Sequence, residues 1–114
     1  MTAIETLEAA IARLESLRDR AFPGPYEPGV GGGDHWYLFA NDESVAYISA
    51  NDGSDEEHRE PTARLIAAMS RTVAHQIALM RSAIREYERW HGCVQQWANE
   101  AFRLAQSILG EEPS

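Results

Sequence analysis

The sequence predicts an α+β fold: an N-terminal helix, a β-hairpin, a long amphipathic helix and a C-terminal helix, packed as an oligomeric helical bundle. Two observations support this fold class. Apolar residues recur every three or four positions over residues 61–90, whereas residues rich in β-favouring types flank a turn within residues 35–50. Because a length of 114 residues suits one hydrophobic core, we expect a single α+β domain over residues 1–114.

Residues 3–20 are expected to form the first helix. Thr2 is suited to cap the N-terminus, and Glu5, three residues later, completes a capping box. Leucine and isoleucine residues follow at helical spacing on a stripe narrow enough to pack against one partner helix. The sequence Pro-Gly-Pro at residues 23–25 must end this helix, because proline interrupts the helical hydrogen bonds.

Residues 28–33, Pro-Gly-Val-Gly-Gly-Gly, are expected to form a flexible loop. A glycine-rich loop that binds phosphate follows a strand and leads into a helix. Here the loop leads into a predicted strand instead. We therefore expect this loop to hold no ligand.

Residues 35–40 and 44–50 are predicted to form a β-hairpin around the turn residues 41–43. Alternation along the first strand places Trp36 on one face and Tyr37 on the other. Because an isolated hairpin is only marginally stable, it must pack on the helices, and it can extend across a subunit boundary.

The long helix is predicted over residues 61–90, with Pro61 in its first turn, where a missing N–H costs nothing. The preceding acidic residues 51–60 are expected to form an exposed loop. A straight helix over residues 61–90 would be ~45 Å long and would overhang one small domain. A bend in the helix or a second subunit packed on the overhanging part would resolve this, and we favour the second subunit. The expected core stripe comprises Ile66, Met69, Val73, Ile77, Met80, Ile84 and Tyr87.

The C-terminal helix is predicted over residues 94–109, after a break near Gly92. One helix that continues through Gly92 is the alternative, since a single glycine costs only ~1 kcal/mol inside a helix. Gly110 is placed to end the last helix.

The charge pattern limits the function classes. The formal net charge is −8, which argues against general nucleic-acid binding, because that requires a basic surface. The single Cys93 fits a reducing compartment. Because the N-terminus resembles no signal peptide and no apolar run is long enough to span a membrane, we expect a cytoplasmic protein without membrane contact.

No catalytic or metal-binding pattern is present. The histidines lack the spacing of zinc ligands, and no nucleophile lies in a recognisable triad, so we expect no catalytic residue, no metal and no cofactor. All ten basic residues are arginines, and several lie along one side of the predicted long helix. Guanidinium groups beside aromatic rings suit a phosphorylated base. The candidate ligand-binding residues are Arg64, Arg71, Arg81, Arg85, Trp36 and Tyr37.

Three segments resemble small uncharacterised proteins of actinobacteria and their phages. The first is Arg-Ala-Phe-Pro-Gly-Pro-Tyr at residues 20–26, in which those proteins carry Ala-x-Pro-Gly-Pro-aromatic after an N-terminal helix and before a β-hairpin. The other two are residues 74–80 and 103–110. Tyr26 stands where the aromatic residue of that family is usually tryptophan. The resemblance implies a phage or mobile-element setting and brings no active site.

Two functions are therefore expected from the sequence. The first is a non-enzymatic accessory protein that acts by protein–protein interaction, with its acidic loop and hairpin engaging a host or viral protein. The alternative is a small-molecule binder that sequesters an anionic (cyclic) nucleotide signal on the arginine-rich face. In both cases we expect a homo-oligomer.

Overall fold

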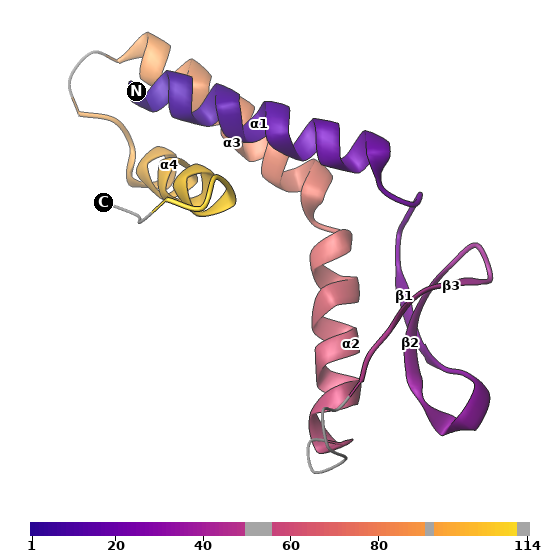
Figure 1. The fold of residues 1–114 in the computed structure, drawn as a ribbon. Helices are drawn as coiled ribbons and strands as arrows, with labels where there is room; N and C mark the ends of the chain where they lie inside the picture. The colour runs from indigo at the N-terminus through magenta and orange to yellow at the C-terminus, as the bar shows by residue number, and fades with distance from the viewer. Residues whose placement is uncertain (50–55, 91–92, 112–114) are drawn as a thin grey trace. The chain divides into compact units, whose positions relative to one another are not determined.

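The computed structural model describes residues 1–49, 56–90 and 93–111 and confirms the α+β class. Its described elements are four α-helices, one short 3-10 turn and a three-stranded antiparallel sheet (Figure 1). The chain divides into two compact units. Unit 1 comprises Met1–Ala21 and Val73–Ser114, and unit 2 comprises Phe22–Thr72.

Helix α1 of unit 1, Ala3–Arg20, has the predicted bounds. The Oγ1 atom of Thr2 accepts a hydrogen bond from the Glu5 amide at 3.1 Å, and Glu5 Oε1 accepts one from the Thr2 amide at 3.0 Å. The backbone and side-chain hydrogen bonds with Thr2 hold the pKa of Glu5 below its usual value. The predicted capping box is therefore confirmed.

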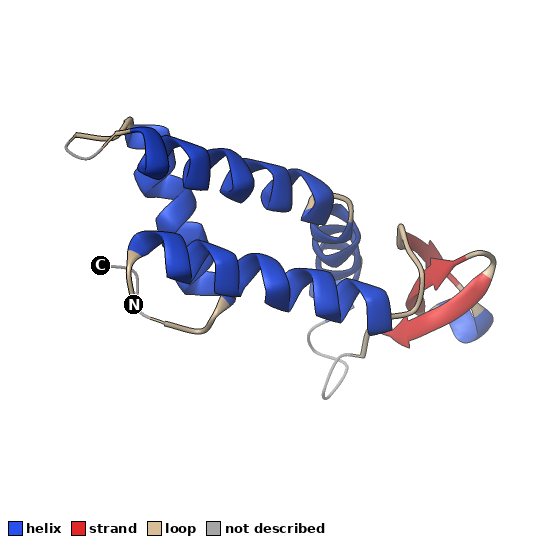
Figure 2. Cartoon of the chain, turned by 90° about the horizontal axis from the view of Figure 1, so that it is seen from above, coloured by secondary structure: helices blue, strands red, loops and turns tan. Residues whose placement is uncertain are grey.

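The core of unit 1 lies among α1, α3 (Val73–Arg89) and α4 (Gln96–Ile108). Helices α1 and α3 run antiparallel and side by side in both views, and α4 packs on both (Figures 1 and 2). The fully buried residues that α4 adds to this core are alanines, with Ile108 partly buried beside them, so its backbone can approach the other two helices closely. The buried core residues are Leu7, Ala10, Ile11, Ile77, Met80, Ala83, Ala98, Ala101 and Ala105.

One polar contact joins the last two helices of unit 1. The Tyr87 hydroxyl donates a hydrogen bond to Asn99 Oδ1 at 2.7 Å. Partial burial raises the pKa of Tyr87, an effect that the charge of Arg103 opposes. The contact lets a half-buried tyrosine keep its hydroxyl hydrogen-bonded beside the core.

Unit 2 contains the sheet, with strand order β1-β2-β3. The strands are β1 (Glu27–Val30), β2 (Trp36–Ala40) and β3 (Glu43–Tyr47), and a 3-10 turn at Gly32–Asp34 joins the first two. Asn41 and Asp42 form the second turn with φ angles of 51° and 66°. Positive φ at both central residues is the geometry that matches a tight hairpin to the twist of its strands.

Helix α2, Glu56–Ser70, packs on one face of this sheet (Figure 1). Ala63 and Ala67 are buried against Leu38, and Trp36 packs beside them. Small side chains on the helix leave room for the larger ones of the strand. The predicted packing of the hairpin on a helix is thus confirmed.

The long helix predicted over residues 61–90 is wrong. It is two helices, α2 and α3, because the chain turns at Arg71 and Thr72. The hydroxyl of Ser70 donates to Ala67 O at 2.6 Å, and that of Thr72 donates to Met69 O at 2.9 Å. These hydroxyl groups donate to carbonyls that would otherwise accept hydrogen bonds from the amides of the next helical turn. They therefore favour the end of α2.

This turn also divides the predicted apolar stripe. Ile77 and Met80 are buried in unit 1, whereas Ile66 and Met69 on α2 are 37% and 57% exposed. The overhang that a single straight helix would create does not arise, so the length argument for a second subunit no longer applies.

The start of the second helical region also differs from the prediction. Helix α2 begins at Glu56 and contains Pro61, so residues 56–60 are helical rather than an exposed loop. Proline fixes φ near its helical value, and a helix can extend ahead of it at the cost of one backbone hydrogen bond. The remaining predicted loop residues, 51–55, lie outside the described residues.

The glycine-rich segment is not a flexible loop, because part of it forms strand β1. Pro28 is compatible with an edge strand, where one side of the backbone needs no partner. The predicted hairpin is confirmed as β2 and β3, but β3 spans Glu43–Tyr47, and its predicted end at Ala50 lies outside the described residues.

A separate C-terminal helix is confirmed as α4. Helix α3 ends at Arg89, while His91 and Gly92, where the break was predicted, lie outside the described residues. Among the described helices, none combines the length and apolar character needed to cross a membrane.

Candidate functional site

The six predicted ligand-binding residues are distributed over both units. Arg81 and Arg85 belong to unit 1, whereas Arg64, Arg71, Trp36 and Tyr37 belong to unit 2. The continuous helix on which the prediction placed the four arginines is absent, because α2 ends at Ser70 and α3 begins at Val73.

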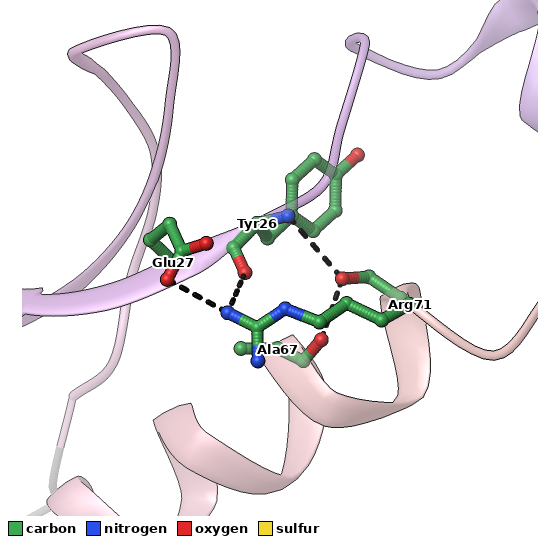
Figure 3. Close-up of polar contacts among 5 residues, drawn as sticks. Tyr26, Glu27, Ala67 and Arg71 are labelled. Atoms are coloured by element: carbon green, nitrogen blue, oxygen red, sulfur yellow. Dashed lines mark hydrogen bonds and ion pairs between the residues drawn. The ribbon is translucent and has the colours of Figure 1, made fainter.

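Arg71 is held by the start of strand β1 (Figure 3). Its Nη2 atom lies 2.7 Å from Glu27 Oε2 and donates a second, longer hydrogen bond of 3.4 Å to the Tyr26 carbonyl. The Tyr26 amide donates to Ser70 Oγ at 3.3 Å, and the same hydroxyl donates to Ala67 O. These contacts fasten the end of α2 to the beginning of the sheet, which gives Arg71 a structural role.

Arg64 and Trp36, two of the predicted residues, lie next to each other. The guanidinium carbon of Arg64 lies 5.5 Å from the centroid of the Trp36 ring, which is a cation–π distance. Arg64 Nε also lies 3.5 Å from Glu60 Oε2, one helical turn earlier. Tyr37, the next residue on β2, lies on the opposite face of the sheet, so it does not join this pair.

The arginines of unit 1 also have acceptors. Arg81 Nη2 lies 2.7 Å from Glu15 Oε2 and links α3 to α1. Arg85 donates to Ser82 Oγ at 2.9 Å, one turn back along α3. A bound phosphate would have to displace these groups.

The strongest candidate site is the face of the sheet opposite α2, which we call the aromatic face. It carries Tyr37, Phe39 and Tyr47. The ring centroid of Tyr37 lies 5.8 Å from that of Phe39 and 5.3 Å from that of Tyr47. The interplanar angles of the two pairs are 42° and 51°. His35 packs edge-on against Tyr47 at 5.4 Å. Within the described residues of unit 2, no helix covers this face.

Two glycines, one in β1 and one directly after it, lie against the rings of Phe39 and Tyr37. A Cβ atom at Gly29 would lie 3.0 Å from the Phe39 ring, and one at Gly31 would lie 2.8 Å from the Tyr37 ring. The rings therefore rest against bare backbone, a known way of stabilising glycine within a sheet. This close approach fixes the orientation of both side chains.

A shallow hollow of about 230 Å³ opens on the aromatic face. Its volume is several times the ~30 Å³ share of one liquid water, so it can admit a small side chain. Its lining residues are Gly31, Gly32, Tyr37, Phe39 and Ser44.

Polar groups at the aromatic face are available to a ligand. Among the described residues, we find no hydrogen-bond partner for the hydroxyls of Tyr37, Tyr47 and Ser44. Asp42 and Glu43, at the adjacent hairpin turn, are exposed and form no ion pair within the described part of the chain. Unit 2 as a whole carries nine acidic residues against three arginines, a formal charge of −6.

Sequence reasoning found Tyr37 but missed Phe39, Tyr47 and the two glycines. The signal was present as an aromatic residue at every second position of a predicted strand, after a glycine-rich run. It was missed because that run was interpreted as a loop rather than as the strand beneath the rings. Across residues 1–49, 56–90 and 93–111, no three His, Cys, Asp or Glu side chains are grouped so as to hold a metal ion.

No protein-family model matches this chain, and no curated protein or solved structure is significantly similar to it. The resemblance to actinobacterial and phage proteins therefore stays a prediction from the three short segments that carry it.

Proposed function

We propose that this chain is a binding protein that acts by protein–protein contact through its aromatic face. The observation that carries the proposal is the cluster of Tyr37, Phe39 and Tyr47 on a sheet face that unit 2 leaves uncovered. Tyrosine and phenylalanine are enriched at the centres of protein interfaces, where a large apolar ring is desolvated. Tyr47 is 47% exposed and still has such area to bury.

The rigidity of the face also supports a binding role. Phe39 and Tyr37 lie close against Gly29 and Gly31, and this contact restricts the orientations open to both rings. Binding at this face therefore costs less free energy for the ordering of side chains than binding at a flexible surface does. We place this activity in a phage or mobile-element accessory protein that works in the host cytoplasm, on the basis of the sequence resemblance and composition.

The nucleotide alternative has weaker support. Two of its four arginines, Arg71 and Arg81, already hold carboxylates at 2.7 Å. A phosphate would replace an existing ion pair rather than satisfy a free cation, so little net gain is expected. We therefore favour the protein-binding function.

Self-association is a second part of the proposal. Leu65 and Met69, one turn apart on α2, are 61% and 57% exposed, and Ile66 lies between them. Contiguous apolar patches of this kind commonly mark contacts between chains. Sedimentation should show a species of at least twice 12.7 kDa, and Leu65→Glu should convert it to monomer. A monomeric wild-type protein at micromolar concentration would contradict this part.

Affinity capture tests the binding function. Tagged wild-type protein, Tyr47→Ala and Val30→Ala are incubated with a lysate of the host, and retained proteins are quantified by mass spectrometry. Val30 is the matched control, because it is an exposed apolar strand residue that pairs with Trp36 on the other face. At least one protein should be lost with Tyr47→Ala and kept with Val30→Ala. If every retained protein survives Tyr47→Ala, the aromatic face is not the contact surface.

A further inference from the structure

We infer that the occupant of the aromatic face is a proline-rich peptide segment in the polyproline II conformation, flanked by basic residues. The inference rests on the proposed function and names the chemistry of its partner. Three properties of the face lead to it: the arrangement of its rings, its unused hydroxyl groups and the charge around it.

The rings form a surface on which proline can pack. Tyr37 stands between Phe39 and Tyr47, with tilted neighbours on both sides at centroid distances of 5.8 and 5.3 Å. Tilted adjacent rings form an uneven surface rather than a flat platform, and a shallow hollow of about 230 Å³ is lined by Tyr37 and Phe39 together with Gly31, Gly32 and Ser44. Aromatic-lined grooves of this type recognise the rigid pyrrolidine rings of polyproline II segments.

The hydroxyl groups supply donors that such a peptide needs. A polyproline II segment has no internal hydrogen bonds, so its carbonyl groups stay open to outside donors. The hydroxyls of Tyr37, Tyr47 and Ser44 have no hydrogen-bond partner among the described residues. Each can therefore donate to a peptide carbonyl without breaking an existing contact.

Charge selects the flanks of the peptide. Ser44 lines the hollow, and the exposed Asp42 lies in the adjacent hairpin turn, while Glu43 begins β3 opposite Ala40. The net charge of −6 on unit 2 attracts cations and repels acidic segments. An arginine next to the prolines would be attracted by Asp42 and by the negative charge of unit 2, whereas a glutamate there would be repelled.

The rigidity of the partner matters as much as its composition. Contacts with Gly29 and Gly31 restrict the Phe39 and Tyr37 rings of the face, and a polyproline II segment is largely ordered before binding. Two preorganised surfaces lose little conformational entropy on association, so a small contact area can still bind measurably.

Fluorescence anisotropy tests the inference with a labelled oligoproline peptide flanked by arginines. We expect micromolar binding by the full chain, and a weakening of about tenfold or more by Tyr47→Ala. Tyr37→Phe, which removes only a hydroxyl, should weaken binding while the circular dichroism spectrum stays that of the wild type. Val30→Ala should bind like the wild type.

Two control peptides define the outcomes that overturn the inference. One replaces every proline with alanine, and the other replaces the flanking arginines with glutamates. Equal binding of the alanine peptide would mean that polyproline II geometry is not recognised, and equal binding of the glutamate peptide would remove the charge argument. If no peptide binds but a captured protein still depends on Tyr47, the inference fails and the proposed function stands.

Discussion

Arg59 donates a hydrogen bond from Nη1 to the Nδ1 atom of His35 across 2.9 Å, which joins the first turn of α2 to the residue before β2. Because a guanidinium group is always protonated, His35 must accept at Nδ1 and can carry a proton only on Nε2 in this state. The Nε atom of Arg59 is buried and has no hydrogen-bond partner. Among the described residues, His35 is therefore the main hydrogen-bond acceptor for the half-buried Arg59 guanidinium.

Removing that acceptor should destabilise unit 2. His35→Phe keeps a ring beside Tyr47 but leaves the Arg59 guanidinium without its histidine, and we expect the free energy of unfolding to fall by about 1–3 kcal/mol. Urea denaturation measures the change. His58→Phe is the control, because that side chain is 67% exposed and should change stability by no more than about 0.5 kcal/mol. Equal stability of the two variants would contradict the proposed importance of the contact.

The two adjacent glycines before β2 should respond differently to alanine. A Cβ atom at Gly31 would lie 2.8 Å from the Tyr37 ring, whereas one at Gly32 would have nothing within 4 Å. Gly31→Ala must displace the ring, so we expect a loss of about 1–3 kcal/mol and an altered near-ultraviolet circular dichroism signal from tyrosine. Gly32→Ala should remain within about 0.5 kcal/mol of the wild type. The reverse order would show that the ring does not rest on Gly31.

The core of unit 1 is tested by two substitutions on the same helix. Ile77 is 2% exposed, and Leu79, two residues later on α3, is 42% exposed. Ile77→Asp puts an unpaired charge into the core and should cost several kcal/mol, enough to unfold a marginally stable unit. Leu79→Asp should be tolerated. Thermal unfolding followed by circular dichroism compares them, and similar melting temperatures would mean that α3 packs through a different face.

The arginines of unit 1 provide a test against nucleotide binding. Arg81 and Glu15 form an ion pair whose side chains are 52% and 36% exposed, so the double variant Arg81→Ala, Arg85→Ala should lose less than about 1 kcal/mol. We expect nucleotides and cyclic nucleotides to leave the melting temperature of the wild type unchanged. A nucleotide-induced rise that disappears in the double variant would instead favour the alternative function.

The capping box of α1 has a pH signature. Its hydrogen bonds hold the pKa of Glu5 below its ordinary value, so its stabilising effect is present above that ordinary value and is lost as the pH falls through the lowered one. Thr2→Ala should raise the pKa of Glu5, measured by NMR titration of its carboxyl group. Thr2→Ser retains the hydroxyl and should leave the pKa low. An unchanged pKa in Thr2→Ala would mean that another group sets it.

Local signals predicted the fold well where they were self-contained. Helix α1 has its predicted bounds because Thr2 and Glu5 define its start and a proline–glycine–proline sequence ends the helical region. The long helix was wrong because apolar periodicity continues through Arg71 and Thr72, where hydroxyl groups compete for the backbone carbonyls. Periodicity reports which face of a helix is apolar, but it does not detect a break that preserves the phase.

The candidate site was only partly predictable for a similar reason. Arg64 and Trp36 do meet, since a cation and an aromatic ring on neighbouring elements attract each other. The aromatic face depends on a third strand whose proline and glycines resemble a loop in composition. Gly29 in that strand and Gly31 directly after it suit their positions because rings from β2 fill the space that their own side chains lack. Such a tertiary contact overrides local propensity.

Unit 2 is one uninterrupted stretch of chain, Phe22–Thr72, which follows α1 and precedes α3 in the sequence. Its two ends are tied to each other, because Tyr26 bonds to Ser70 and Glu27 to Arg71 (Figure 3). Segments whose ends lie close together are the ones that proteins exchange, lengthen or lose with least damage to the remaining fold. We therefore expect that unit 2 can be exchanged for another segment with closely spaced ends while the core of the three-helix unit stays intact.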